Sequence, residues 1–185
     1  MGQSDSKLEY FFEEIRNGNI ENLKSILNNP NNNNIILEII NNHDNNENYP
    51  LLIGTLKDNI EIVKLLINYA NKNNIVLKIN EQDKKGNYPL LLATDNNNIE
   101  IVKLLIDYAN KNNIILEINE QNKNGDYPLL RATYKNNIEI FNLLIDYANK
   151  NNIVLKINEQ DKKGNYPLLL ATRGNNIEIV KLLID

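Results

Sequence analysis

One tetrapeptide recurs along the chain at a constant spacing. Tyr-Pro-Leu-Leu starts at Tyr49, Tyr88, Tyr127 and Tyr166, so that consecutive copies begin 39 residues apart. A fixed period of this size indicates stacked copies of one supersecondary unit. Because each unit is too small to bury its apolar face alone, neighbouring units have to cover it. The sequence therefore predicts a repeat solenoid, with an extended surface suited to binding.

Composition narrows the class of protein. Charged residues make up 24% and hydrophobic residues 42% of the 185 residues, as in ordinary soluble proteins. The net charge of −4 argues against a general nucleic-acid binder. There is no cysteine, which excludes disulfides, Cys-based metal sites and thiol nucleophiles. Since neither a membrane-spanning apolar run nor a secretory signal occurs, we expect a cytoplasmic protein without integral membrane association.

The unit formed by residues 88–126 predicts a pair of helices. Pro89 lacks an amide hydrogen and has a preset φ, so it suits the first position of a short helix over 90–94. Asn98 can cap a second helix over 99–109. That second helix is apolar on most sides, as expected for a helix that lies between two neighbouring repeats.

The remainder of the unit predicts an extended return and a turn. Residues 114–119 alternate apolar and polar side chains, which favours an extended segment with one buried face. Gly125 lies in a polar stretch where a positive φ is expected. The many Asn residues fall at turns and caps, where Asn tolerates left-handed backbone. Glu100 and Lys103 are predicted to pair on the exposed edge of the second helix.

From about Leu8 onward, these motifs resemble the ankyrin repeat. Ankyrin repeats have a finger that ends in Asp-x-x-Gly, a Thr-Pro-Leu-His helix start and a second helix close to Glu-Ile-Val-Lys-Leu-Leu. The matching stretches here are Asp83-Lys84-Lys85-Gly86, Tyr88-Pro89-Leu90-Leu91 and Glu100-Ile101-Val102-Lys103-Leu104-Leu105. The resemblance implies an all-α solenoid of stacked helix-turn-helix pairs with hairpin or extended fingers. It also implies a non-enzymatic module that binds a partner protein or peptide on its concave, finger-bearing surface.

The repeat boundaries follow from the period. We expect an N-terminal tail over 1–7 and a solenoid over 8–185. The solenoid divides into a capping repeat 8–48, repeats 49–87, 88–126 and 127–165, and an incomplete repeat 166–185.

The capping repeat is degenerate. Its two helices are expected over 8–16 and 20–28, with a polar outer side. Its finger, 42–48, lacks the glycine and is predicted to be one residue longer than the others.

Two departures from the family pattern matter. Thr-Pro-Leu-His is replaced by Tyr-Pro-Leu-Leu, so we expect a ladder of Tyr side chains and Leu packing in place of the Thr cap and the His network. The family period is about 33 residues, and the excess here falls after the second helix. We therefore expect a longer second helix or a longer return loop. The recurring Tyr69, Tyr108 and Tyr147 are predicted to pack as part of the scaffold.

No catalytic or metal-binding constellation is apparent. His43 is the single histidine and has no second group in a suitable pattern. Glutamates recur once per repeat, as a structural edge does. The stretch 120–125 weakly resembles a calcium loop, but Lys85 and Lys163 stand at ligand positions in the other copies, and Arg131 replaces the closing Glu. We therefore expect no enzyme activity, cofactor or metal.

Differences between copies mark a candidate binding surface. Arg131 stands where the other copies have Ile53, Leu92 and Leu170. Arg and Tyr anchor interfaces more often than other residues, and a cationic and aromatic cluster suits an acidic or phosphorylated peptide. The alternative is drift at exposed positions, with Arg131 extending its charge into solvent. The candidate partner-binding residues are Arg131, Tyr134, Lys135, Arg173 and Asp95, with Lys84, Lys85 and Lys123 on the fingers.

Both ends of the chain suggest further possibilities. Gly2 with Ser6 matches the myristoylation pattern, which predicts a weakly membrane-tethered adaptor as an alternative function. Another alternative is the substrate-recognition part of a larger enzyme or ligase. The final helix, 177–185, is as apolar as the internal ones. We therefore expect either a longer array or self-association through the C-terminal repeat.

Overall fold

The computed structural model describes residues 3–184, apart from the side chains of residues 3–5, 30 and 33. Over this range the chain is helical and contains no strand. The elements are α1 (Gln3–Asn17), α2 (Ile20–Asn28), the 3-10 turn η1 (Pro30–Asn32), α3 (Asn33–Ile39), α4 (Pro50–Leu56), α5 (Ile60–Lys72), α6 (Pro89–Asp95), α7 (Ile99–Lys111), α8 (Pro128–Tyr134), α9 (Ile138–Lys150), α10 (Pro167–Arg173) and α11 (Ile177–Ile184).

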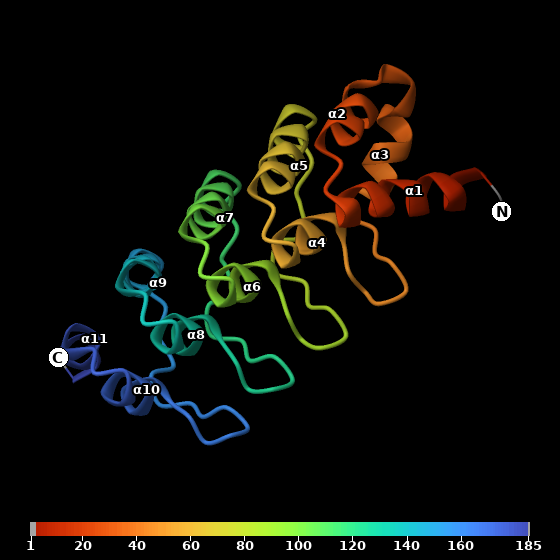
Figure 1. Cartoon of the computed structure of the whole chain (residues 1–185). Helices are drawn as coiled ribbons and strands as arrows, with labels where there is room; N and C mark the ends of the chain where they lie inside the picture. Colours follow the sequence, from red (N-terminus) through yellow and green to blue (C-terminus); the bar gives the residue numbers. More distant parts are fainter. Residues whose placement is uncertain (1–2, 185) are drawn as a thin grey trace.

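The helices form two parallel rows. The inner helices α4, α6, α8 and α10 lie in one row, and the outer helices α5, α7, α9 and α11 lie in the other (Figure 1). A finger loop precedes each inner helix, and the fingers project to one side of the stack (Figure 1). The predicted all-α repeat solenoid is therefore confirmed, whereas the predicted repeat boundaries stay a prediction.

Asparagine residues lie at both ends of the outer helices α5, α7 and α9. The Asn98 side chain caps α7 by accepting a hydrogen bond from the Ile101 amide at 3.0 Å, as predicted, and Asn59 and Asn137 cap α5 and α9 in the same way. Asn97 adopts a φ of 62°, the left-handed conformation that Asn tolerates. The prediction that Asn serves caps and turns is confirmed, and α7 extends two residues beyond the predicted end.

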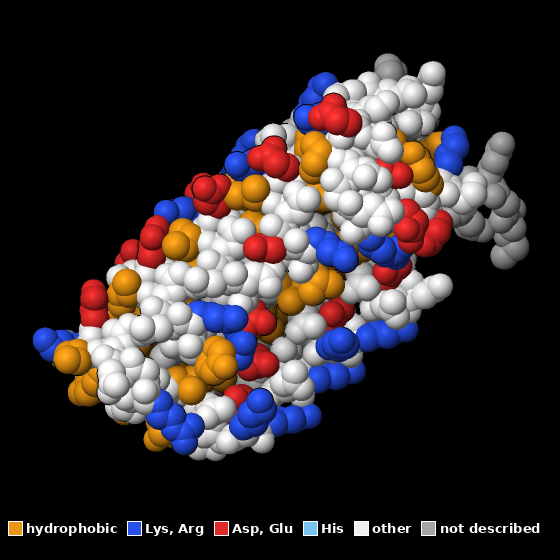
Figure 2. Space-filling view, viewed as in Figure 1, with side chains coloured by type: hydrophobic (Ala, Val, Ile, Leu, Met, Phe, Trp, Pro, Cys, Tyr) orange, Lys and Arg blue, Asp and Glu red, His pale blue; other side chains and the backbone are white. Residues whose placement is uncertain are grey.

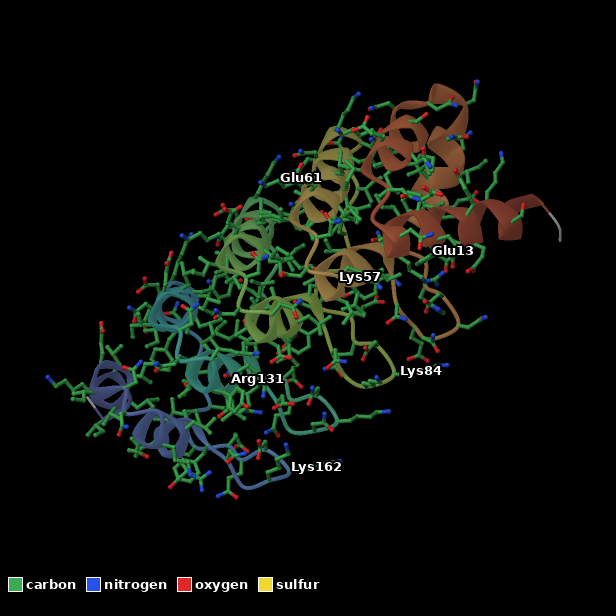
Figure 3. The ribbon with its side chains drawn as sticks, viewed as in Figure 1. Glu13, Lys57, Glu61, Lys84, Arg131 and Lys162 are labelled. Atoms are coloured by element: carbon green, nitrogen blue, oxygen red, sulfur yellow. The ribbon has the colours of Figure 1, made fainter. Side chains whose placement is uncertain are left out.

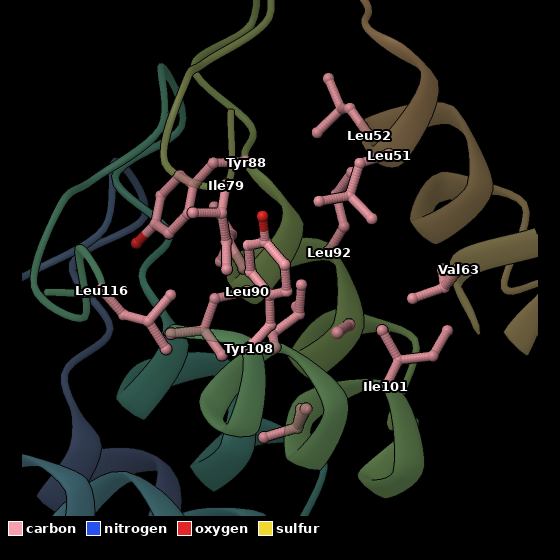
Figure 4. Close-up of a cluster of buried hydrophobic side chains, with 14 of the residues drawn as sticks. Leu51, Leu52, Val63, Ile79, Tyr88, Leu90, Leu92, Ile101, Tyr108 and Leu116 are labelled. Carbon is pink, nitrogen blue, oxygen red and sulfur yellow. The ribbon is translucent and has the colours of Figure 1, made fainter. Parts of the chain in front are cut away.

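The core lies between the two rows and is continuous through the repeats. Tyr88 and Ile101 are fully buried in it (Figure 4), and so is Leu105. The Tyr88 hydroxyl donates to the Glu120 carbonyl in the following finger at 2.9 Å, and Tyr49 and Tyr127 make the equivalent bond. These bonds confirm the predicted ladder of Tyr side chains, in which the tyrosine of each Tyr-Pro-Leu-Leu motif joins its repeat to the next finger.

A second tyrosine ladder holds the return segments. The Tyr108 hydroxyl accepts from the Leu77 amide at 2.9 Å and donates to the Ile75 carbonyl at 3.1 Å. Tyr147 makes the same pair of bonds to Leu116 and Ile114. The predicted scaffold role of these residues is confirmed at these two positions.

The return segments that follow the outer helices are joined to one another by asparagine side chains. The Asn80 side chain bridges two neighbouring return segments. Its Nδ2 donates to the backbone carbonyl of Ile115 at 2.7 Å, and its Oδ1 accepts from the backbone amide of Glu117 at 3.2 Å. Asn41 and Asn119 repeat this arrangement with the segments that follow them. Asn side chains thus join the returns without a sheet.

The predicted Glu100–Lys103 pair is wrong. Lys103 pairs instead with Glu139 of the next repeat at 2.7 Å, and Glu100 lies 3.8 Å from Lys64 of the preceding repeat. Because the outer helices lie side by side, a lysine reaches the first-turn glutamate of the neighbouring helix. These ion pairs therefore link repeats.

The first repeat departs from the others. Its second helix spans the predicted residues, but the return that follows is folded as helix α3 (Figure 1). The predicted longer finger is wrong, because Asp44 and Asn48 close the turn with the same bonds as Asp83 and Asn87. Glu47 occupies the glycine position, with a φ of 63°.

Candidate partner-binding site

The candidate residues lie on one surface of the solenoid. We call it the finger face, which consists of the inner helices and the fingers that precede them. A hollow of about 370 Å³ opens there between α8, α10 and the last two fingers. It is lined by Asn124, Asp126, Leu130, Arg131, Tyr134, Asp161, Lys162, Lys163, Asn165 and Leu170.

Arg131 is the centre of this site. It is the fourth residue of α8, and its side chain is 21% exposed. Its Nε donates to Oδ1 of Asp95 at 2.6 Å, and Nη2 donates to the same oxygen. Its third nitrogen, Nη1, lies 3.6 Å from Oδ1 of Asp126. The guanidinium carbon lies 4.6 Å from the centroid of the Tyr134 ring, a cation–π distance.

An exchange of two residues places Asp126 beside Arg131. In the neighbouring fingers an aspartate, Asp83 or Asp161, holds the turn, and an asparagine four residues later donates to it. In the third finger Asn122 holds the turn, and the residue four positions later is Asp126. The carboxylate of Asp126 cannot donate the side-chain bond that asparagine donates in the other fingers, so it is available to Arg131.

The centre of the site is therefore electrically balanced. Lys135 lies 3.8 Å from the same Asp95 oxygen, so two cations face the two carboxylates of Asp95 and Asp126. The predicted cationic patch is wrong for this centre, because the aspartates neutralise Arg131 and Lys135. What the centre does present is an aromatic surface, since Tyr134 is 59% exposed.

Arg173 is close to the hollow and supports its rim. Its Nη1 donates to Oδ1 of Asn165, a lining residue, at 3.1 Å. The neighbouring Asp161 holds the finger turn: burial acts to raise its pKa, but hydrogen bonds from Asn165 and from the backbone lower the pKa below its ordinary value. Asp161 thus stays ionised and keeps this finger fixed.

Positive charge gathers instead at the finger tips. Lys84 and Lys162 project from two of the fingers (Figure 3), and Lys and Arg side chains form a row along this edge of the surface (Figure 2). Backbone hydrogen bonds between neighbouring fingers fix the spacing of this row of lysines. The Lys123 amide donates to the Lys85 carbonyl at 2.9 Å, and the Lys162 amide donates to the Asn124 carbonyl at 2.9 Å. The exposed lysines at the finger tips are Lys84, Lys85, Lys123, Lys162 and Lys163.

Sequence reasoning identified part of this arrangement. The structure brings Arg131, Tyr134, Lys135 and Asp95 together, and it places Lys84 and Lys85 on the finger next to the two that line the hollow. Lys162 and Lys163 were missed, although they repeat the Lys-Lys pair at 84–85 and so carried a signal. Asp126 was missed as well, and its signal was an aspartate where the other fingers have asparagine.

Other predicted features lie elsewhere or outside the described residues. His43 is exposed, and its Nδ1 lies 3.1 Å from the Asp44 carbonyl oxygen. Gly2 lies outside the described residues. Within residues 3–184 no group of three or more His, Cys, Asp or Glu side chains could hold a metal ion. In the same range, each helix is too short or too polar to cross a membrane.

Comparison with known proteins agrees with this architecture. A family model of ankyrin repeats matches the chain three times, over residues 11–115, 75–153 and 113–185. No curated protein matches the sequence. The matched residues cover most of the chain and coincide with the paired helices and fingers. The chain therefore belongs to the ankyrin-repeat family.

Proposed function

We propose that the chain binds a partner protein through its finger face, and that an acidic segment of the partner lies along the finger tips. Ankyrin repeats are generally protein–protein interaction modules and typically not enzymes. The observation that carries the proposal is the hollow beside Tyr134, which combines an exposed aromatic ring with flanking lysines.

Each part of this surface has a separate role in the proposal. Tyr134 offers a large apolar contact, and the stacked Arg131 holds its ring in place before binding. The finger lysines supply long-range attraction, which mainly accelerates association and selects for acidic partners. The balanced charges of Arg131, Lys135, Asp95 and Asp126 position the ring and contribute little net charge.

A displayed library of random peptides tests the proposal. We expect peptides selected on the wild type to be enriched in Asp and Glu, and to bind poorly to a Lys162→Glu, Lys163→Glu variant. A Lys111→Glu, Lys150→Glu variant carries the same change in charge at the ends of α7 and α9 and serves as the control. Neutral peptides that bind all three proteins equally contradict the proposed chemistry.

Three further assignments rest on the sequence alone and are proposals. They are a cytoplasmic location, a lipid tether at Gly2 that would make the chain a membrane-associated adaptor, and a role in substrate recognition within a larger enzyme or ligase. Mass spectrometry of natively expressed protein tests the tether directly, because an acylated N-terminal glycine has a characteristic mass.

A further inference from the structure

The Tyr69 hydroxyl has no hydrogen-bond partner among the described groups, although it is buried. Tyr69 is 7% exposed and occupies the same helical position as Tyr108 and Tyr147. Those two tyrosines each bind the amide and the carbonyl of a preceding return segment. A buried hydroxyl without a partner is destabilising. The position beside Tyr69 therefore lacks the extended return segment that the other repeats supply.

A return segment that could fill this position is present in the chain. The seven residues of α3, 33–39, read Asn-Asn-Ile-Ile-Leu-Glu-Ile, and the same seven residues occur at 112–118. There they form no helix, and Leu116 donates its amide to Tyr147. One sequence thus adopts two backbone conformations in one chain, so local propensity does not decide between them.

Helix α3 is a weakly determined helix. It has seven residues, three of which are Ile, and its N-cap residue Asn32 makes no side-chain capping bond. Short helices rich in β-branched residues and without caps are marginal. Leu37 is 46% exposed on α3, whereas Leu116, which matches it in the identical stretch 112–118, is buried in a return segment, as is Leu77. The helix buries Ile36 instead, so the two conformations bury comparable aliphatic side chains.

There is also room beside Tyr69 for an extended segment. Helix α2 has 9 residues and α5 has 13, so α2 ends a turn earlier. A cleft of about 270 Å³ lies between the two helices and is lined by Leu27, Leu65 and Tyr69, among others. Residues 29–32 separate α2 from α3, and extended chain of this length reaches over 10 Å.

We propose that the α2–α5 cleft is a docking site for an extended strand, and that its occupant is residues 33–39 of this chain. In the docked state the Tyr69 hydroxyl donates to the Ile35 carbonyl and accepts from the Leu37 amide, as Tyr108 does with Ile75 and Leu77. Leu37 becomes buried and Ile36 becomes exposed. The first repeat thus has two states, one with the cleft open and α3 formed, and one with the cleft closed.

Thiol labelling of single-cysteine variants tests this proposal, because the chain contains no cysteine. Leu37→Cys is compared with Ile115→Cys, which replaces a 54% exposed residue, and with Leu116→Cys, which replaces a 1% exposed residue. We expect Leu37→Cys to react more slowly than Ile115→Cys. Adding Tyr69→Phe removes the hydroxyl that holds the strand, which shifts the ratio of the two states, and hence the labelling rate, by about fivefold. Tyr108→Phe is the matched control and leaves the rate unchanged.

Backbone chemical shifts of residues 33–39 provide a second readout that does not need the Leu37 substitution. We expect them to lie between helical and extended values, and to move towards helical values in Tyr69→Phe. Fully extended shifts in the wild type support the docked state as the dominant one. The proposal is overturned if the shifts are fully helical with and without the Tyr69 hydroxyl. It is also overturned if Leu37→Cys reacts as fast as Ile115→Cys in both backgrounds.

Discussion

The guanidinium of Arg131 binds the carboxylate of Asp95 in the preceding repeat, with Nε 2.6 Å from Oδ1. The same guanidinium faces Asp126 at 3.6 Å and stacks on Tyr134. Arg131 and Asp126 replace residues that are Leu and Asn in the next repeat, at Leu170 and Asn165. The two substitutions therefore compensate each other.

This compensation predicts non-additive stability effects. Arg131→Leu alone leaves Asp126 without its partner and Asp95 with Lys135 only, and we expect it to lower the free energy of unfolding by up to about 1.5 kcal/mol. Adding Asp126→Asn restores the residue pair of the next repeat and should recover part of that loss in urea melts. If the second substitution instead adds a loss of its own, Asp126 is not held by Arg131.

Burial predicts which residues of α7 matter for stability. Leu105 is fully buried between repeats, so Leu105→Ala should cost about 2–5 kcal/mol. Lys103 pairs with Glu139 at the surface, and Lys103→Ala should cost less than about 1 kcal/mol. Urea unfolding of both variants checks the orientation of this helix, and equal losses would show that the orientation is wrong.

The fingers make a prediction about glycine. Glu47 adopts a φ of 63°, which strains any residue with a β-carbon, so Glu47→Gly should stabilise the chain by up to about 1 kcal/mol. Gly86 has a φ of 79°, and a β-carbon there would lie 2.9 Å from the Asn122 Cα. Gly86→Ala should therefore destabilise by about 2–4 kcal/mol. Thermal melts that rank the two variants in the opposite order refute this account of the finger turn.

The tyrosine ladder predicts a loss of stability in alkali. Burial raises the pKa of Tyr88 and Tyr49 well above 10. Because the folded pKa exceeds the unfolded one, their contribution is complete below about pH 10 and declines as the pH rises above that value.

Urea melts between about pH 8 and about pH 11 measure this decline. Tyr88→Phe should reduce the slope and should cost about 0.5–1.5 kcal/mol at neutral pH through loss of the bond to Glu120. Tyr10→Phe replaces a 51% exposed tyrosine and is the control. A slope that Tyr88→Phe leaves unchanged would assign the alkaline loss to other groups.

Features that repeat could be predicted from the sequence. The period of Tyr-Pro-Leu-Leu predicted the solenoid, and the position of Asn98 before an apolar run predicted a helix cap. Both features depend on local chemistry and on neighbouring repeats of the same sequence. The partner of Lys103 could not be predicted this way. Glu100 in its own helix and Glu139 in the next are both near in principle, and only the packing of α7 against α9 selects one.

The candidate site was predicted only where single copies differ in an obvious way. Arg131 among leucines was a clear signal, but its neutralisation by Asp95 and Asp126 depends on contacts between repeats and between a finger and a helix. Helix α3 was missed for a stronger reason. Residues 33–39 have the same sequence as 112–118, so no local rule separates their conformations.

The most direct test of the proposed binding surface is the affinity of a selected acidic peptide for three proteins, measured by titration calorimetry. Tyr134→Ala removes the exposed ring of the hollow and should weaken binding at least about tenfold. Ile115→Ala removes a similarly exposed apolar side chain from a return segment and should leave the affinity unchanged. Equal affinities for the wild type and Tyr134→Ala, with both proteins fully folded, would contradict the account.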